Sequence, residues 1–387
     1  MTLRVSKPSF NVREKLTELA VKFGLKGSEL AKAETVQDAR DLVSAGRKNM
    51  VINGDMRIFQ RNNAGNVPNV GTYYLDRFQS RNNTEGTLYV TQQQSNTSGP
   101  PGFRSWLLAQ CDFADTSVDS GNYARIQQYI EGYNCFMDWG LAGGNTDHIT
   151  ASFWVKSNKI GKYCFNIEDG DALPVFCREY TIKKSDVWQK VELTFPPPPA
   201  GTWRGNDSNT GMRLTWTLMA GSGHPLTANT WNTSYGMRTT GHVNFMDNAN
   251  NNFYLTGIQL EVGKNATEFE YRSYGEELAL CQRYFLKTSN AFGCVYQSSG
   301  NTGNVGLGIC FPVEMRIASS NSNTTLPTGT ANNVHNYGDG NNSYVAGGVY
   351  AGTTRGSQIY LTGGSGKTIG TFSVLNTDAP IQFNAEL

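Results

Sequence analysis

Between residues 49 and 267 the chain consists of short segments rich in aromatic and β-branched residues, separated by clusters of Gly, Asn, Asp and Pro. Such segments predict β-strands, and the clusters predict the turns between them. No helical segment alternates with the strands, so the pattern favours an antiparallel sandwich or jelly roll over a parallel α/β fold. The clearest strand candidates are 50–52, 87–92, 124–130, 150–156, 163–167, 188–195, 212–219 and 253–262.

The composition supports this mainly β fold class. Charged residues make up 17% of the chain, whereas aromatic residues make up 11% and glycines number 42. The polarity therefore comes from Asn, Gln, Ser, Thr and Gly, and Asn and Gly tolerate the positive φ angles of hairpin turns. A net charge of +1 gives no reason to expect nucleic acid or an anionic membrane as the main partner. Because the chain has no apolar run of about 18 residues, we expect no membrane span.

Two regions differ from this central part. Residues 1–48 carry ten basic and six acidic residues and two capping-box patterns, which predict short helices that must dock on another surface. Residues 288–387 hold sixteen Gly, twelve Asn and seven charged residues, which predicts a second β region with strands near 357–362 and 370–375. We expect a helical anchoring segment at 1–48, a jelly-roll sandwich at 49–267, a junction helix at 268–287 and a distal β domain at 288–387.

The expected junction helix rests on the spacing of apolar residues in the segment 268–287. Leu278, Cys281 and Phe285 fall on one helical face within otherwise β-rich sequence. Such a helix packs either on its own sandwich or against copies of itself on a threefold axis.

Seven cysteines lie in apolar or strand-like contexts, and no CxxC pair occurs. This pattern predicts reduced, mostly buried thiols in a protein made in a cytoplasm. The opening residues, MTLRVSKPSFNVREKL, lack the apolar core of a secretory signal.

Several strings together carry a resemblance to a known family. They are RKNMVINGDM (47–56), YLDRF (74–78), SFWVKS (152–157), WQKV (188–191), TGIQLEVG (256–263) and the segment 268–285. In this order they resemble tail-fibre or virion fibre proteins of tailed bacteriophages that contain a carbohydrate-binding-module-like jelly roll.

The resemblance implies a non-enzymatic, homotrimeric virion component that is assembled in the host cytoplasm. It implies that residues 1–48 attach to other virion proteins and that the jelly roll is a spacer or a glycan-binding module. The distal domain would then meet a bacterial surface polysaccharide, with specificity in the Gly/Asn-rich loops of 297–343. A capsid or neck decoration without a host ligand is an open alternative. A glycan-degrading tailspike, which would use two carboxylates several ångströms apart, is another.

Candidate ligand-binding residues come from tryptophans in Gly/Asn-rich loops. Sugar sites stack aromatic rings on pyranose C–H faces and place polar side chains beside them. Trp139, Trp203 and Trp231 fit this description, and Arg204 follows Trp203. The alternative is that these rings anchor their loops or contact another subunit.

Three other tryptophans, Trp154, Trp188 and Trp216, lie within strand candidates, and we expect them in the core.

The sequence predicts no catalytic residue, no cofactor and no metal. The acidic turn 168–171 and Asp247 offer oxygen atoms of the kind that bind hard cations, but their spacing is not that of a calcium loop. A solvated turn is the preferred interpretation. The histidines and cysteines show no zinc spacing, and no GxSxG nucleophile motif occurs.

Overall fold

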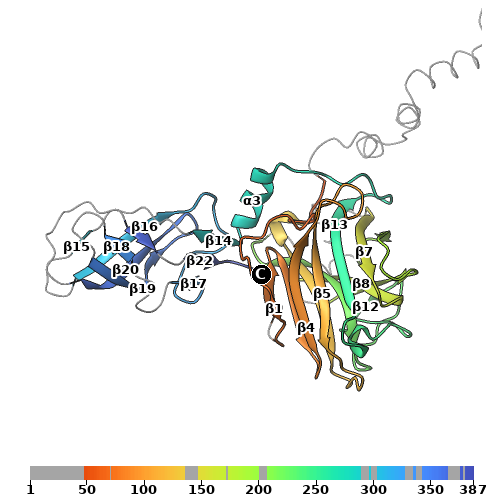
Figure 1. The fold of residues 1–387 in the computed structure, drawn as a ribbon. Coiled ribbons are helices and arrows are strands. Elements are labelled where there is room, and N and C mark those ends of the chain that lie inside the picture. The colour runs from red at the N-terminus through yellow and green to blue at the C-terminus, as the bar shows by residue number, and fades with distance from the viewer. Residues whose placement is uncertain are drawn as a thin grey trace, which may run out of the picture.

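The computed structural model describes residues 48–69, 71–135, 147–170, 173–199, 207–288, 296–297, 303–326, 334–336, 342–364, 375–377 and 380–387. The expected helical anchor at 1–48 therefore lies, except for Lys48, outside the described residues. The described part is mainly β, with several antiparallel sheets and the short helix α3 (Tyr274–Gln282), which confirms the predicted fold class (Figure 1).

Two sheets form the larger body of the molecule, and sheet A faces the viewer in Figure 1. Sheet A has the order β1-β4-β5-β13-β7-β10, with the bounds Gly65–Asn66, Thr87–Gln94, Ser105–Phe113, Asn252–Val262, Ile149–Ser157 and Gln189–Phe195. Sheet B has the order β12-β9-β8-β11-β6-β3-β2, with the bounds Trp231–Asn232, Val175–Ile182, Gly161–Asp169, Thr210–Ala220, Tyr123–Glu131, Phe78–Asn83 and Thr72–Leu75. Two 3₁₀ turns, η1 and η2, cover Gly132–Asn134 and Phe245–Asp247.

The main core lies between sheets A and B. Phe153 of β7 contacts Phe165 of β8 at a ring-centroid distance of 5.3 Å and Trp216 of β11 at 5.7 Å. All three side chains are fully buried, which confirms the core position predicted for Trp216. Full burial of one large apolar side chain stabilises the fold by about 1.5–3 kcal/mol.

The predicted strand at 50–52 is wrong, because this segment forms an irregular edge beside β13. Met50 N donates to Leu260 O and Ile258 N donates to Gly54 O, each at 2.9 Å. The Asn49 side chain donates to Ile258 O and accepts from Leu260 N, each at 3.0 Å. A Cβ at Gly54 would lie 2.2 Å from Ile258 O, so this close approach requires glycine.

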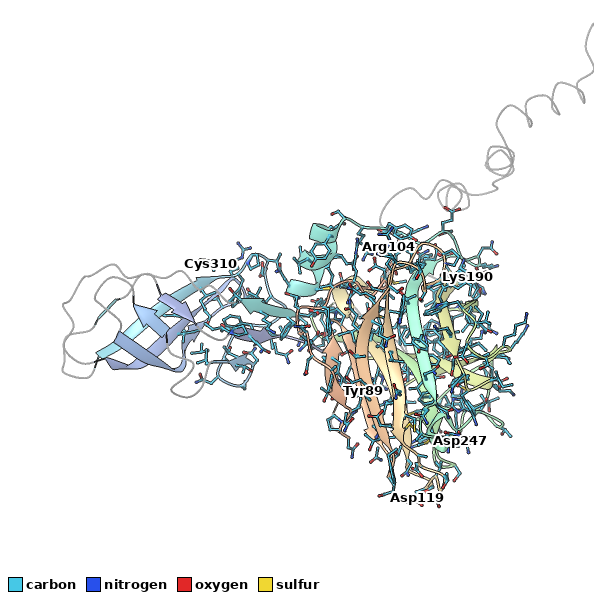
Figure 2. All side chains as sticks on the ribbon, viewed as in Figure 1. Tyr89, Arg104, Asp119, Lys190, Asp247 and Cys310 are labelled. Carbon is cyan, nitrogen blue, oxygen red and sulfur yellow. The ribbon has the colours of Figure 1, made fainter. Side chains whose placement is uncertain are left out.

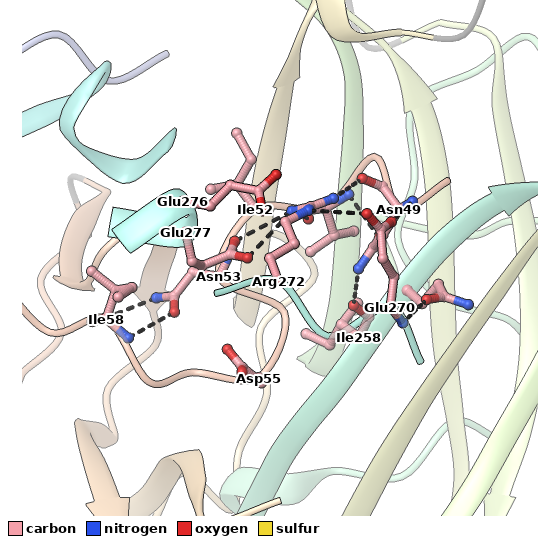
Figure 3. A network of polar contacts seen from close by, with 12 residues as sticks. Asn49, Ile52, Asn53, Asp55, Ile58, Ile258, Glu270, Arg272, Glu276 and Glu277 are labelled. Carbon is pink, nitrogen blue, oxygen red and sulfur yellow. Dashed lines mark hydrogen bonds and ion pairs between the residues drawn. The ribbon is translucent and has the colours of Figure 1, made fainter. Parts of the chain in front are cut away.

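Arg272 is the central cation of a buried network at this edge (Figure 3). Its guanidinium donates to the carbonyl oxygens of Asn49 and, at 3.1 Å, of Val51. It also lies 3.4 Å from carboxylate oxygens of Glu270 and Glu277. The network therefore joins residues near 50 to residues near 270.

The two carboxylates in turn hold the backbone of the irregular edge. Glu270 accepts from Lys48 N at 3.0 Å and from Asn49 N at 2.6 Å, and Glu277 accepts from Asn53 N at 2.5 Å (Figure 3). Asn53 adopts a positive φ of 60°.

Helix α3 packs on its own sandwich, which is the first of the two packings expected for it. Ser273 caps its N-terminus by accepting a hydrogen bond from Glu276 N at 3.2 Å. Cys281 is fully buried in a small cluster that contains Ile52, Ile58 and Tyr284. The homotrimer stays a prediction.

Two further sheets follow α3. Sheet C has the order β14-β22-β17, with the bounds Phe285–Thr288, Ile381–Asn384 and Thr324–Thr325. Sheet D has the order β15-β16-β20-β19-β18-β21, with the bounds Tyr296–Gln297, Gly303–Cys310, Gly356–Gly364, Asn342–Gly352, Val334–Asn336 and Leu375–Thr377. The strand expected at 357–362 falls within β20, whereas the one expected at 370–375 lies, except for Leu375, outside the described residues.

The C-terminus returns to the joint between the sandwich and sheet C (Figure 1). The buried carboxylate of Glu386 pairs with the guanidinium of Arg77 and, at 3.0 Å, with that of Arg61. Tyr73 donates to Leu387 O at 2.8 Å. Sheet C is therefore tied to the sandwich by the last residues of the chain.

Within the described ranges, no helix combines the length and the apolar character needed to span a membrane.

Replacing Arg272 by Met should lower the free energy of unfolding by about 3–5 kcal/mol, because Glu270 and Glu277 would lose their buried cation. Urea denaturation measures this loss. Arg355→Met is the matched control, since its pair with Glu314 is 81% and 49% exposed and pairs of this kind contribute about 0–1 kcal/mol. Equal losses in the two variants would contradict the role given to Arg272.

The free energy of unfolding should depend on pH through Asp76. This carboxylate accepts hydrogen bonds from Gln60 N and Nε2 at 2.7 Å each. Burial raises the pKa of Asp76 from 3.8 to about 6. The folded protein thus binds this proton more tightly than the unfolded chain. The resulting stability is present below about pH 4 and is lost as pH rises through about 6.

Between pH 4 and pH 8 the stability of Asp76→Asn relative to wild type should therefore rise by on the order of 2–3 kcal/mol. Denaturation at several pH values measures it, with the exposed Asp119→Asn as control. Parallel pH curves for Asp76→Asn and wild type would show that Asp76 is not the responsible group.

Candidate functional site

The side chains that point out of sheet B form a surface that we call the polar face. Side chains alternate along a strand, so every second residue of each strand belongs to it. Strand β6 reads YARIQQYIE. Tyr123, Arg125, Gln127 and Tyr129 therefore point outward, whereas Ile126 packs in the core.

The strand register arranges the polar face in rows. The amide row crosses β3, β6, β11 and β8 and consists of Gln79, Gln127, Thr215 and Asn166. The arginine row lies two residues away along each strand and consists of Arg81, Arg125 and Thr217. Amide, hydroxyl and guanidinium groups are thus presented side by side from four neighbouring strands.

The carboxylates on this side of the sheet are held in ion pairs. Glu168 is fully buried and accepts from Arg213 Nε at 3.0 Å and from Thr215 Oγ1 at 2.7 Å. Glu131 is also fully buried and accepts from Arg283 Nη2 at 2.5 Å and from the hydroxyl of Tyr284 at 2.6 Å. Both carboxylates therefore have structural partners.

The segment 221–244 contacts part of the polar face. Met237 O accepts from Asn166 Nδ2 at 3.0 Å and from Thr217 Oγ1 at 2.9 Å. His242 is buried in the same segment, and its Nε2 lies 3.0 Å from Thr217 O. Burial lowers the pKa of His242 to about 4, so its ring is neutral at pH 7.

Several buried atoms on the polar face have no hydrogen-bond partner. They are Oε1 of Gln127, Oδ1 of Asn166 and the Nε atoms of Arg81 and Arg125. Leaving such a group unsatisfied costs about 1–3 kcal/mol. Two acceptors and two donors, in adjacent rows, can therefore gain from a ligand that offers both hydrogen-bond donors and acceptors.

Tyrosines surround these groups. Gln127 Nε2 donates to the hydroxyl of Tyr129 at 2.8 Å. Arg125 Nη1 donates to the hydroxyl of Tyr235 at 2.6 Å, and the guanidinium carbon lies 4.8 Å from the ring centroid of Tyr123. Tyr235 is 37% exposed. Rings next to amides and guanidinium groups can contact an amphipathic ligand.

The outer surface of sheet A carries a second group of aromatic rings, where Figure 2 labels Tyr89 and Lys190. Trp188 contacts Trp106 edge-to-face at a centroid distance of 5.8 Å and Tyr254 at 6.0 Å. The core position predicted for Trp188 is wrong, because the residue precedes β10 and its ring lies half-buried on this outer surface. Its indole Nε1 donates to Ser98 O at 2.8 Å.

The prediction of a core position is also wrong for Trp154. It is half-buried and alternates along β7 with the inward-facing Phe153 and Val155.

Of the predicted ligand-binding residues, Trp139, Trp203 and Arg204 lie outside the described residues. Trp231 lies in β12 at the edge of sheet B, where its ring contacts Phe176 edge-to-face at a centroid distance of 5.1 Å. Its Nε1 donates to Pro197 O at 2.9 Å. These contacts anchor the loop, and the role predicted for Trp231 in ligand binding stays a prediction.

The sequence reasoning did not identify the polar face. The alternation of Tyr123, Arg125, Gln127 and Tyr129 is a period-two signal that marks them as one face. Their burial, however, depends on residues distant in sequence and cannot be read from β6.

The expected solvated turn at 168–171 is wrong for Glu168, which is buried and ion-paired. Asp247 pairs with Lys159 and accepts from Asn251 Nδ2 at 2.9 Å. No group of His, Cys, Asp and Glu able to hold a metal ion occurs among the described residues.

The described cysteines are free thiols. Cys111, Cys164, Cys177 and Cys281 are buried, while Cys310 is exposed.

No family model matches the chain, and no curated protein matches it either. Among solved structures, the enzymatically active domain of tailspike protein 4 from bacteriophage CBA120 matches with a TM-score of 0.31 and 11% identity, over 55% of this chain and 21% of that chain. TmCBM61 in complex with β-1,4-galactotriose matches with a TM-score of 0.27 and 11% identity, over 56% of this chain and 99% of that chain. The family 11 carbohydrate-binding module from Clostridium thermocellum matches with a TM-score of 0.26 and 11% identity, over 53% and 97%.

This chain therefore spans about a fifth of the tailspike chain and nearly all of the two modules. The neighbours include a phage tailspike domain and carbohydrate-binding modules.

Proposed function

We propose that the protein binds a bacterial surface saccharide through the polar face of sheet B, as a virion fibre component and without cleaving the saccharide. The observation that carries this proposal is the polar face, where Gln127 keeps an unpartnered acceptor oxygen and the half-buried Arg81 keeps an unpartnered donor. Saccharides present many hydroxyl groups that donate and accept hydrogen bonds. They therefore suit a surface of amides, hydroxyls and guanidinium groups flanked by tyrosine rings.

Binding without cleavage is supported by the partners of Glu168 and Glu131, two carboxylates at this face. A glycosidase needs one carboxyl group to donate a proton and a second to act as nucleophile or base. Glu168 and Glu131 are each engaged by a guanidinium and a hydroxyl group. Neither is free for such a role.

The virion role belongs to the same proposal and rests on the sequence resemblance. In it, residues 1–48 attach the protein to other virion proteins, and the fibre is a homotrimer that reaches a host polysaccharide.

A second candidate function is structural decoration of the particle without a host ligand. It is favoured by the half-buried rings of Trp188, Trp154 and Tyr254 on the outer surface of sheet A. Rings of this kind suit contacts between copies of a chain as well as they suit a ligand.

The test is retention of the full-length protein on envelope polysaccharides from a panel of candidate hosts, with reducing ends assayed in the same samples. Gln127→Leu should weaken retention about tenfold, because the ligand loses one or two hydrogen bonds of about 1 kcal/mol each. Thermal stability should change little, because the variant loses the hydrogen bond from Gln127 to Tyr129 but no longer buries an unpartnered oxygen.

The control is Gln94→Leu, at an exposed position of β4, which should change neither retention nor stability. Equal retention of wild type and Gln127→Leu would refute the polar face as the binding surface. New reducing ends would show cleavage, and no retention on any polysaccharide would favour decoration.

A further inference from the structure

We infer that the polar face selects an acidic saccharide, and that Arg81 and Arg125 bind its carboxylate or phosphate oxygens. This inference rests on the proposed saccharide binding and adds the chemical class of the ligand.

Three other cations around sheet B have carboxylate partners. Arg213 pairs with Glu168, Arg283 pairs with Glu131 at 2.5 Å, and Lys162 pairs with Glu179 at 3.2 Å. In the described part of the chain, Arg81 and Arg125 form no such ion pair, and the Nε atom of each is buried without a partner. The arginine row therefore carries two guanidinium groups without a counter-charge.

The register places these two cations opposite each other. Arg81 on β3 is the direct cross-strand partner of Arg125 on β6, and the residue-to-residue spacing of such pairs is about 4.5–5.5 Å between Cβ atoms. Like charges in this arrangement destabilise a sheet. Arg125 is moreover only 2% exposed, and burying a cation without a counter-charge is costly. An anion bound between the two side chains would relieve both penalties.

The groups that contact Arg125 supply no counter-charge, so its guanidinium can still bind an anion. They are the ring of Tyr123, the hydroxyl of Tyr235 and the thioether of Met237, whose sulfur lies 3.5 Å from Nη1. All three are neutral, and a charged oxygen is a stronger acceptor for a guanidinium than a phenol oxygen. Tyr235 is 37% exposed, so the acceptor that an anion would replace lies at the solvent side.

The surroundings favour a saccharide as the carrier of the anion. The amide row lies directly beside the arginine row. The unpartnered oxygen of Gln127 in this row can accept a hydrogen bond from a sugar hydroxyl group. Tyr123 and Tyr235 supply ring faces for sugar C–H groups. A guanidinium binds a carboxylate or a phosphate with two parallel hydrogen bonds, so a uronic acid and a sugar phosphate present the same chemistry to this pair.

The experiment is titration calorimetry of the full-length protein with three oligosaccharides of matched length. One is a hexuronate oligomer, the second is the same oligomer with its carboxyl groups reduced to alcohols, and the third is a phosphorylated oligosaccharide. We expect one of the two acidic ligands to bind at least tenfold more tightly than the reduced oligomer. The difference should shrink as salt rises from 50 to 500 mM, because the preference is electrostatic.

Arg81→Gln changes the half-buried member of the pair and keeps Arg125, so folding should be retained. It should lower affinity for the acidic ligand at least tenfold more than affinity for the reduced oligomer. Arg104→Gln, at an exposed position just before β5 (Figure 2), is the matched control and should change neither.

The outcomes separate the two proposals. Equal binding of acidic and reduced oligomers would overturn the acidic preference and leave saccharide binding standing. An equal loss for both ligands in Arg81→Gln would assign that arginine a structural role and also overturn the inference. Binding of none of the three, with none of the host polysaccharides retained, would overturn saccharide binding itself. Preference for the phosphorylated ligand alone would support the inference and identify phosphate as the anion.

Discussion

The buried cation Arg272 is the interaction on which the arrangement of the other parts depends. It joins the carbonyl groups of Asn49 and Val51 to the carboxylates of Glu270 and Glu277. The segment that enters the sandwich and the segment that leaves it are thereby fixed to one another, and α3 begins at a defined place. Two of the strings behind the family resemblance, 47–56 and 268–285, thus meet in one network. A single charge with several acceptors thus holds the two strings together.

Strand β6 links the proposed binding surface to the joint between the sandwich and sheet C. Along one face it presents Arg125, then Gln127, then Tyr129, and it ends at Glu131, which holds Arg283 and Tyr284 just before sheet C. The carbonyl group of Tyr129 also accepts from Arg77, the partner of Glu386. The strand that carries the proposed ligand-binding groups therefore also anchors the distal strands. These hydrogen bonds and ion pairs tie the two parts together.

The sequence predicted the fold class because aromatic and β-branched runs mark strands wherever both faces of a sheet are covered. The predictions from the sequence were wrong where contacts between distant residues determine the local structure. The apolar run at 50–52 looked like a strand, but the side chain of Asn49 and the close approach at Gly54 turn it into an irregular edge. Trp188 was expected in the core because it lies within a strand candidate, yet it precedes β10 and lies on the outer surface of sheet A. The arginine row could not be predicted, because a one-residue change in register would separate Arg81 from Arg125.

The position of the unpartnered groups also bears on how a ligand would be discriminated. They lie on strands rather than on loops, so they are pre-organised and little conformational entropy is lost on binding. With a net charge of +1, the chain generates no large field that would attract an acidic polymer from a distance. The preference for an acidic ligand must then arise from contacts within the site. Coulomb interactions are several times stronger in a desolvated site than in bulk water, so a buried guanidinium favours an anionic ligand far more than a surface lysine would. A neutral saccharide would leave the penalty of the buried Arg125 in place, whereas an anionic one would relieve it, and this difference would favour the acidic ligand.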